Sequence, residues 1–494
     1  MKRMCGMYWK LPLPKARGSI TVYLTGILLV MLSVVLMLVE VTKWIAVKTE
    51  SLAVCNMAMD SCFAEYHKAL LEEYDLFFID TSYGTKVPSV NLLKSHLAEY
   101  IRKNLNPQEE VLLWNYRDFL GLHLQDVQLT QMSLATDDGG RDVLYQATEY
   151  MRDKVGLGMI EDIQARYAQL TQSGMLTTDV GSQMDQYQGE IDAAPKAVVE
   201  VEEGVFEEVC VDSPSDNVRM SLFSGLLGMV VPDVRNLSYA GVNPTNYVSG
   251  RSIAVGSGAS CPKQGFDFVD DILFGEYLME KCGCYSKEKE GSELAYELEY
   301  VVNGQSADQD NLVAVITQLS LLRWAADAMY IYGDSGKVAI AEGAAIAIAA
   351  ISLQPELVVP LKHVLLLAWA YMEAVMDVRR LLGGAKVPLF KTADDWCMSF
   401  EGMANYQAEL ASHDGKSTAG LDYRMYLRLL LLLQPRETKV LRLMDLIEMR
   451  IRKTEGNANF RLDGCVSAME AIMTIAAQNG EVVQVTKQYE YMNR

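Results

Sequence analysis

The sequence is poor in histidine and has none of the short motifs that mark common enzyme classes. Five histidines are scattered through 494 residues, and no His-Glu-x-x-His pair that would bind zinc is present. A Gly-x-Ser-x-Gly nucleophile elbow, a Walker A loop and a Gly-x-Gly-x-x-Gly dinucleotide loop are also missing. The sequence therefore identifies no catalytic residue, no metal ligand set and no cofactor, and we expect a protein that is not an enzyme.

Positive charge is scarce as well. Lysine and arginine number 44 against 64 aspartates and glutamates, which gives a net charge of −20. Five of the bases lie in residues 1–18 without any acid, so removing them leaves −25 on the rest of the chain. Binding to phosphate groups needs clustered lysine and arginine, and the composition therefore excludes nucleic acid as the expected partner.

Charge of either sign is missing from residues 19–39, a run of 21 residues. As a helix this run is about 30 Å long, the thickness of the hydrocarbon core of a bilayer. The bases in residues 1–18 place the N-terminus in the cytoplasm by the positive-inside rule, and the bulk of the chain outside the cell membrane. A cleavable signal peptide is the alternative, but its core is usually about 7–15 residues and ends in small residues, which this sequence lacks. We therefore expect a retained single-pass anchor.

Proline and glycine are absent between Gly26 and Gly84, so no helix-breaking residue ends the helix at the membrane surface. An apolar stripe continues beyond the anchor at alternating steps of four and three, interrupted at Lys48. Its members are Val41, Ile45, Leu52, Cys55, Met59, Cys62 and Tyr66. The spacing predicts one helix over residues 19–74. Its stripe packs either on the chain's own domain or on partner subunits, and the sequence leaves both alternatives open.

The segment Arg17-Gly18-Ser19-Ile20-Thr21-Val22-Tyr23 resembles the start of the pilin-like proteins of tight-adherence (Tad) pilus systems. In those proteins a basic stretch that ends in glycine precedes a long apolar helix. The processed members carry glutamate five residues after that glycine, where this chain has Tyr23. The resemblance therefore implies a member that stays uncut as a membrane anchor.

Further stretches resemble an uncharacterised family of membrane-anchored proteins of Gram-positive bacteria, which tends to accompany Tad pilus genes. These stretches are Phe63-Ala64-Glu65-Tyr66, Tyr74-Asp75-Leu76-Phe77-Phe78-Ile79-Asp80, Leu134-Ala135-Thr136-Asp137, Gly275-Glu276-Tyr277-Leu278 and residues 422–432. The resemblance implies a structural or assembly component of a Tad-type pilus or secretion apparatus. An anchored extracellular receptor or hydrolase of unknown substrate is the alternative, with the long loop near residues 236–261 beside its site.

The expected partners are the membrane and pilin-like or pilus-assembly proteins, contacted through the long N-terminal helix. Small side chains let helices approach closely in lipid, which favours Gly26 and Ser33 as packing positions. The complete set of candidate anchor and packing residues is Arg17, Gly18, Tyr23, Gly26, Ser33, Leu52 and Met59.

Of the nine cysteines, Cys5 is expected in the cytoplasm and eight outside. The outer eight are candidates for disulfides, which their even number permits but does not require: Cys55, Cys62, Cys210, Cys261, Cys282, Cys284, Cys397 and Cys465. Cys55 and Cys62 are two helical turns apart, about 10 Å, and cannot bridge each other. Cys282-Gly283-Cys284 has no further ligand nearby in the sequence to complete a zinc site.

The pattern of elements predicts an α+β fold dominated by helices. We expect a cytoplasmic segment (1–18), a transmembrane helix (19–39), its extension with a first strand at residues 74–80 (40–80), an α+β part (81–235), a loop-rich linker (236–262) and a helical part with flanking strands (263–494). Strands are also expected within residues 111–134, and residues 193–208 as a surface connection.

The helical part carries five runs with broad apolar faces, at residues 311–332, 337–353, 355–382, 418–433 and 437–453. Alternating residues predict a half-exposed strand at 293–302 that pairs with residues 481–491. Residues 338–353 and 361–376 are apolar, but each is about 16 residues long and contains charges, which favours a soluble bundle over further membrane spans.

Overall fold

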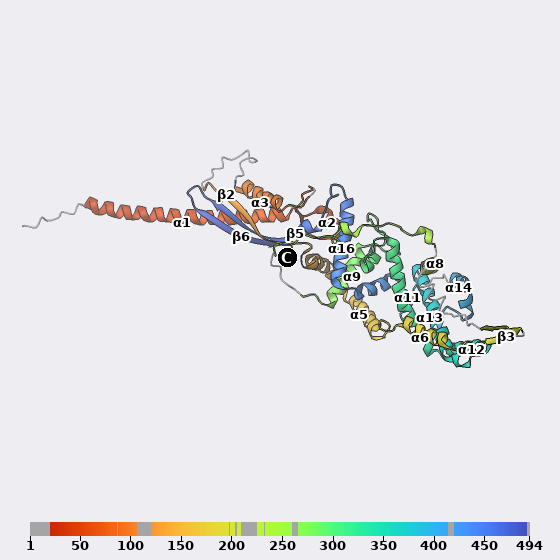
Figure 1. The fold of residues 1–494 in the computed structure, drawn as a ribbon. Coiled ribbons are helices and arrows are strands. Elements are labelled where there is room, and N and C mark those ends of the chain that lie inside the picture. Colours follow the sequence, from red (N-terminus) through yellow and green to blue (C-terminus); the bar gives the residue numbers. More distant parts are fainter. Residues whose placement is uncertain are drawn as a thin grey trace, which may run out of the picture. The chain divides into compact units, whose positions relative to one another are not determined.

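The structure, a computed structural model, describes residues 20–491 except 86, 106–119, 197, 203–204, 209–224, 232, 259–264 and 413–418. Helices dominate, and the strands form a small four-stranded sheet and a separate two-stranded one, which confirms the predicted fold class (Figure 1). The chain divides into two compact units. Unit 1 takes its residues from 1–64, 91–130 and 470–489, and unit 2 from 65–90, 131–469 and 490–494.

Unit 1 contains helix α1 (Ile20–Phe63) and almost all of α3 (Val90–Leu105), together with parts of the strands β2 (His123–Leu134), β5 (Cys465–Ala476) and β6 (Val482–Glu490). The last third of α1 has one buried face, and the ring of Phe63 lies 4.3 Å from that of Tyr489 in β6. The buried residues of α1 are Val47, Ser51, Val54, Cys55, Ala58, Met59, Cys62 and Phe63.

The prediction of a single helix over residues 19–74 is correct only as far as Phe63. A second helix, α2 (Lys68–Tyr74), follows after a short break. At the break the backbone N–H of His67 donates to the carbonyl of Phe78 at 2.8 Å, and its ring Nδ1 accepts from the N–H of Leu70 at 3.1 Å. A tertiary hydrogen bond therefore holds the chain at the break, and the histidine side chain caps the start of α2, without proline or glycine.

The four-stranded sheet has the order β1–β5–β2, with β6 also paired to β5. Strand β1 is only Ile79–Asp80, which pairs antiparallel with the start of β5, so the prediction of a strand at residues 74–80 is wrong for residues 74–78. The backbone N–H of Ala477 donates to the carbonyl of Glu481 at 2.8 Å and closes the β5–β6 turn. The predicted strand at the C-terminal end therefore exists, but its partner is β5.

Residues 293–302 do not form the predicted strand. They enter helix α10 (Glu297–Asn303), in which every residue from 297 to 302 is buried. The glutamates expected to face solvent instead accept backbone hydrogen bonds, Glu297 from Gly283 at 2.6 Å and Glu299 from Tyr285 at 2.9 Å. The alternation of apolar and acidic residues was misleading because the acids lie inside.

The five predicted helical runs are present in unit 2 as α11 (Asp308–Gly333), α12 (Ser335–Ile351), α13 (Val358–Leu382), α15 (Tyr423–Leu433) and α16 (Arg436–Lys453). Among the described residues, three helical stretches are long and apolar enough to cross a membrane. They are α1, whose most apolar window is 0% buried, α11 at 67% and residues 355–382 at 78%. The burial of α11 and α13 agrees with their predicted place in a helical bundle.

The other helices of unit 2 are α4 (Arg141–Arg152), α5 (Leu157–Gln172), α6 (Val180–Ala193), α8 (Leu226–Val230), α9 (Phe268–Lys281) and α14 (Tyr406–Ser412). The acidic stretch predicted as a surface connection forms a hairpin of β3 (Val198–Glu202) and β4 (Val205–Glu208). Residues 236–258 are largely irregular, as predicted, and the linker proposed there falls inside unit 2. The strand expected at residues 111–119 lies outside the described residues.

Candidate functional site

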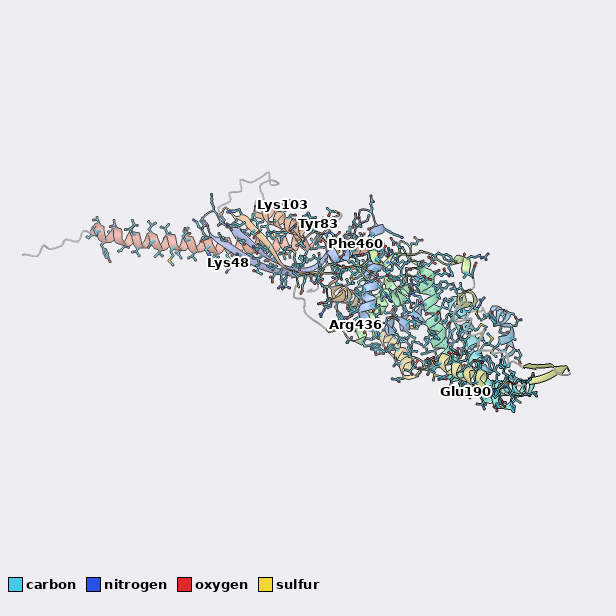
Figure 2. The ribbon with its side chains drawn as sticks, in the orientation of Figure 1. Lys48, Tyr83, Lys103, Glu190, Arg436 and Phe460 are labelled. Atoms are coloured by element: carbon cyan, nitrogen blue, oxygen red, sulfur yellow. The ribbon has the colours of Figure 1, made fainter. Side chains whose placement is uncertain are left out.

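The first half of α1 is an uncovered apolar rod. Every residue from 20 to 45 is exposed, and Figure 2 shows the side chains standing free along the helix until Lys48 is reached. The hydroxyls of Thr25 and Ser33 are satisfied within the helix, since Thr25 donates to the carbonyl of Thr21 at 2.8 Å and Ser33 to that of Val30 at 2.7 Å. An unpaired hydroxyl in hydrocarbon is costly, so this surface suits an apolar surrounding without further partners.

The end of the apolar rod is marked by charged and aromatic side chains. Glu40 and Lys43 approach to 3.8 Å, and the ammonium of Lys48 lies 5.3 Å from the ring centre of Trp44. Tryptophan and lysine are the residues that gather where a helix leaves the hydrocarbon region. The part of α1 before Glu40 therefore has the length and the flank of a membrane span.

The structure places the predicted packing residues of the anchor on this rod. Tyr23 is 74% exposed, and a Cβ built on Gly26 meets no atom within 4 Å. Arg17 and Gly18 lie outside the described residues. What Tyr23, Gly26 and Ser33 contact in an assembly stays a prediction.

Leu52 and Met59 do not share the buried stripe that the sequence predicted. Met59 is fully buried in unit 1, whereas Leu52 is 46% exposed. The buried face instead follows Val47, Ser51 and Cys55, and the stripe residues Val41, Ile45 and Leu52 lie off it. The helix thus has two apolar faces outside the anchor, one turned to its own unit and one uncovered.

No disulfide joins the described cysteines to one another: Cys55, Cys62, Cys282, Cys284, Cys397 and Cys465. Cys210 and Cys261 lie outside the described residues. Burial raises the pKa of Cys55 to about 12 and that of Cys282 and Cys465 well above the ordinary value, which makes these thiols poor nucleophiles. Within the described part of the chain, no group of three His, Cys, Asp or Glu side chains is placed to hold a metal ion. Cys282 and Cys284 therefore have no further described ligands with which to form a metal site.

A buried charge network joins α11 and α13, and the sequence analysis missed it. The guanidinium of Arg323 donates to Asp327 and Asp377 at 2.9 Å each, and the ammonium of Lys391 lies 2.9 Å from Asp377 and contacts Glu373. All five side chains are at most 1% exposed. Burial raises the pKa of Asp327 to about 8. The network contains three carboxyls and two cations, so one proton bound to a carboxyl makes it neutral.

This network holds a connecting segment rather than lining a reaction site. Glu373 also accepts from the backbone N–H groups of Cys397, at 3.0 Å, and Met398, at 2.5 Å. The charges therefore attach the chain after α13 to the helix pair. A usable signal was present in the sequence, because acids and bases spaced four apart inside strongly apolar helices need buried partners.

The long loop at residues 236–258 is fixed by a second set of buried ions. Arg251 donates to Glu448 at 2.6 and 2.7 Å and to Asp463 at 2.6 Å, and Ser249 N–H donates to Asp445 at 2.9 Å. Burial opposes ionisation of Asp463, but hydrogen bonds from Arg461 and Arg251 lower its pKa to about 2. The loop proposed as the border of a receptor or hydrolase site is thus bound to α16 and to the start of β5.

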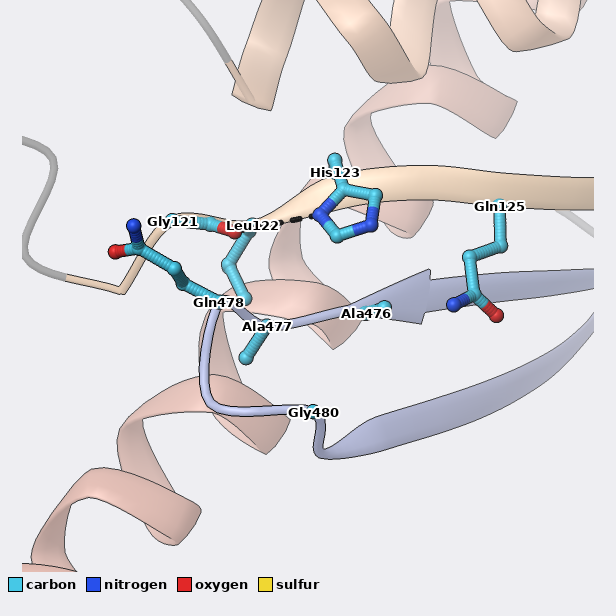
Figure 3. Close-up of a pocket in the computed structure, with 8 residues that line it drawn as sticks. All are labelled: Gly121, Leu122, His123, Gln125, Ala476, Ala477, Gln478 and Gly480. Atoms are coloured by element: carbon cyan, nitrogen blue, oxygen red, sulfur yellow. Dashed lines mark hydrogen bonds between the residues drawn. The ribbon is translucent and has the colours of Figure 1, made fainter.

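The described residues form a surface depression in each unit. In unit 1, an open depression of about 690 Å³ lies between residues 121–125 and the β5–β6 turn, where His123 lies 3.4 Å from the carbonyl of Gly121 (Figure 3). In unit 2, about 550 Å³ is lined largely by apolar residues of 175–181, α11 and α15, and its Asp179 caps α6 through Ser182 N–H at 2.9 Å. The described residues that line either depression bring no nucleophile beside a base.

Comparison with known families gives one match. Residues 205–477, more than half of the chain, match DUF5702, a family of unknown function. The matched range includes α8 to α16 and β5. No curated protein and no solved structure matches the chain.

Proposed function

Since the chain belongs to the DUF5702 family of unknown function, its relatives supply no activity, and we propose that it is a membrane-anchored structural or assembly component of a Tad-type pilus or secretion apparatus. In this proposal it is not an enzyme. The five bases of residues 1–18 hold the N-terminus in the cytoplasm, residues 19–39 span the cell membrane, and the remainder of the chain lies outside it.

The observation that carries the proposal is the continuity of α1. One helix runs from an uncharged, wholly exposed half into a last third whose face is buried in unit 1, with no linker between the two. A flexible tether would let a folded domain explore the surface, whereas a continuous helix gives it one direction relative to its anchor. A fixed direction suits a subunit of an assembly, and the likeness of residues 17–23 to Tad pilin-like proteins favours that class of assembly.

The exposed rod is the proposed contact with other pilin-like subunits. Tyr23, Gly26 and Ser33 lie within about 80° of one another around the helix axis, at 100° per residue. Gly26 leaves open space beside the backbone, which lets a neighbouring helix approach closely. The acidic remainder of the chain then acts as a platform or cap carried by that contact.

Site-specific photo-crosslinking in cells tests this function. A photoreactive residue at Gly26 or Ser33 is expected to capture pilin-like or pilus-platform proteins, because these positions share the proposed face. The matched controls are Leu28 and Val35, which lie on the opposite side of the same apolar helix and should capture lipid. Capture of no pilus-type protein from Gly26 and Ser33, or equal capture from all four positions, would contradict the proposal. Neighbouring genes for a secretion ATPase and membrane platform proteins would support it independently.

A further inference from the structure

The outer face of α12 is an uncharged apolar surface that none of the described residues of its own unit covers. Ile340, Ile346 and Ile351 are 49%, 53% and 78% exposed, whereas Ala341 and Ala345 on the inner side are buried. The outer face consists of Gly336, Ala339, Ile340, Gly343, Ile346, Ala347, Ala350 and Ile351, all of them exposed. At 100° per residue these eight positions occupy one continuous arc of about 140°.

The area of this surface lies within the range of the largest apolar patches on single-chain proteins, which are often functional. With on the order of 170 Å² for a fully exposed isoleucine and about 100 Å² for a small residue, the face exposes on the order of 500 Å². A standard protein interface covers roughly 800 Å² on each partner, so this helix alone supplies more than half of one side.

The sequence of the face is nearly symmetric about Gly343 between residues 336 and 350, whereas Ile351 has Ser335 as its counterpart. Ile340 matches Ile346, Ala339 matches Ala347, and Gly336 matches Ala350, each pair equally distant from the glycine. In an antiparallel pair of α12 helices with a two-fold axis at Gly343, each of these residues faces its own match on the other helix. Small residues then meet at the crossing, where backbones approach most closely, and isoleucines flank them.

We propose that this face docks on α12 of a second copy of the chain, as an antiparallel helix pair that crosses at Gly343. A self-complementary surface is what a two-fold homodimer requires. This inference concerns unit 2 alone and goes beyond the proposed role of the anchor.

The charges around α12 favour a second copy over a lipid surface. Glu342 lies 4.0 Å from Lys362, and Lys337 lies 2.8 Å from Asp334, so the two charged side chains of α12 are each paired within the chain. A helix that lies on a membrane usually presents lysine and arginine beside its apolar face, and the net charge of −20 opposes approach to anionic lipid.

Gly343→Leu separates docking from folding. A Cβ at Gly343 meets no atom within 4 Å and the backbone there has no positive φ, so leucine fits the single chain and favours helix. The full chain in detergent micelles is measured by light scattering over a range of concentrations. We expect a dimer for the wild type and a dissociation constant about 100-fold higher, or monomers only, for Gly343→Leu, with unchanged thermal unfolding.

Gly158→Leu is the matched control, because Gly158 is an exposed helical glycine of α5 that also has no atom within 4 Å of a built Cβ. It should dimerise as the wild type does. A monomeric wild type, or a Gly343→Leu protein that still dimerises, would overturn the proposal.

Engineered cysteines test the two-fold geometry. Gly343→Cys places equivalent thiols at the crossing point and should give a disulfide-linked dimer on mild oxidation. Ile351→Cys lies 8 residues along the helix, so its thiols end on opposite sides of the crossing, about 24 Å apart in an antiparallel pair, and should not cross-link. Cross-linking of Ile351→Cys without Gly343→Cys would indicate a parallel or different contact and refute the antiparallel pair.

Discussion

Glu299 is a fully buried carboxyl with one oxygen left unpaired. Its replacement by glutamine allows a prediction of whether stability rises or falls with pH. Its Oε1 accepts from the hydroxyl of Tyr423 at 2.7 Å and from the N–H of Tyr285 at 2.9 Å, while Oε2 has no partner. Burial raises the pKa of this carboxyl from 4.5 to about 7, against the smaller opposing effect of those hydrogen bonds. Aspartate Asp308 adds a further small increase.

The sign follows from proton binding. Between about pH 4.5 and 7 the folded chain holds the Glu299 proton while the unfolded chain loses it, so the free energy of unfolding falls as pH rises through this range. A shift of this size corresponds to about 3 kcal/mol at pH 8 and to well under 1 kcal/mol at pH 4.5. Glutamine has the shape and the hydrogen-bonding groups of the protonated acid, and it cannot ionise. Glu299→Gln should therefore be more stable than the wild type at pH 8 and nearly equal to it at pH 4.5.

Thermal unfolding of the full chain in detergent between pH 5 and 8 measures the difference. At about 2 °C per kcal/mol, the gap between variant and wild type should widen by about 5 °C across this range. Glu297→Gln is the control in the same helix, because Glu297 is paired with Arg450 at 3.0 Å and its neutralisation should lower stability throughout. Parallel melting curves for wild type and Glu299→Gln against pH would refute the argument.

Two further predictions concern unit 1 and the buried network. Met59→Asp should destabilise unit 1 by about 3–5 kcal/mol, because it buries an unpaired charge. Leu52→Asp, on the exposed side of α1, should change the temperature of thermal unfolding little. Equal effects of the two substitutions would show that the buried face of α1 is assigned wrongly. Lys391→Met should lower the free energy of unfolding, measured by denaturant titration, by about 3–5 kcal/mol, because it leaves the buried carboxylate of Glu373 without its cation. Adding Glu373→Gln should restore part of this loss. If the double variant shows no recovery, the loss is not caused by charge.

The features predicted correctly from the sequence are those that depend on length and period. The long apolar helix at the start of α1 follows from 21 uncharged residues, and the five helical runs of unit 2 follow from broad apolar faces separated by glycine and proline. Neither prediction depends on which residues the segment packs against.

The errors occur where a long-range contact decides the outcome. The break after Phe63 depends on a hydrogen bond between His67 and Phe78, and α10 depends on glutamates that turn inward to backbone N–H groups and Arg450. Likewise, the spacing of Leu52 and Met59 placed both on one stripe, although the contacts of unit 1 select a face rotated away from Leu52. Periodicity identifies an apolar face, but only tertiary packing determines which one is buried.

Because α1 is one unbroken helix, the number of residues between Glu40 and Val47 determines how its buried face is oriented relative to its first half. Each residue turns the helix by 100° and advances it by 1.5 Å, so this short stretch sets the azimuth of unit 1 around the anchor axis as well as its height above the lipid. Inserting a single residue there would swing the buried face by more than a quarter of a turn relative to Tyr23 and Gly26, whereas inserting seven would nearly restore it and lift the unit by about 10 Å. In the proposed membrane-anchored assembly, the number of residues in this segment, more than their chemical character, therefore determines which side of unit 1 faces a neighbouring subunit.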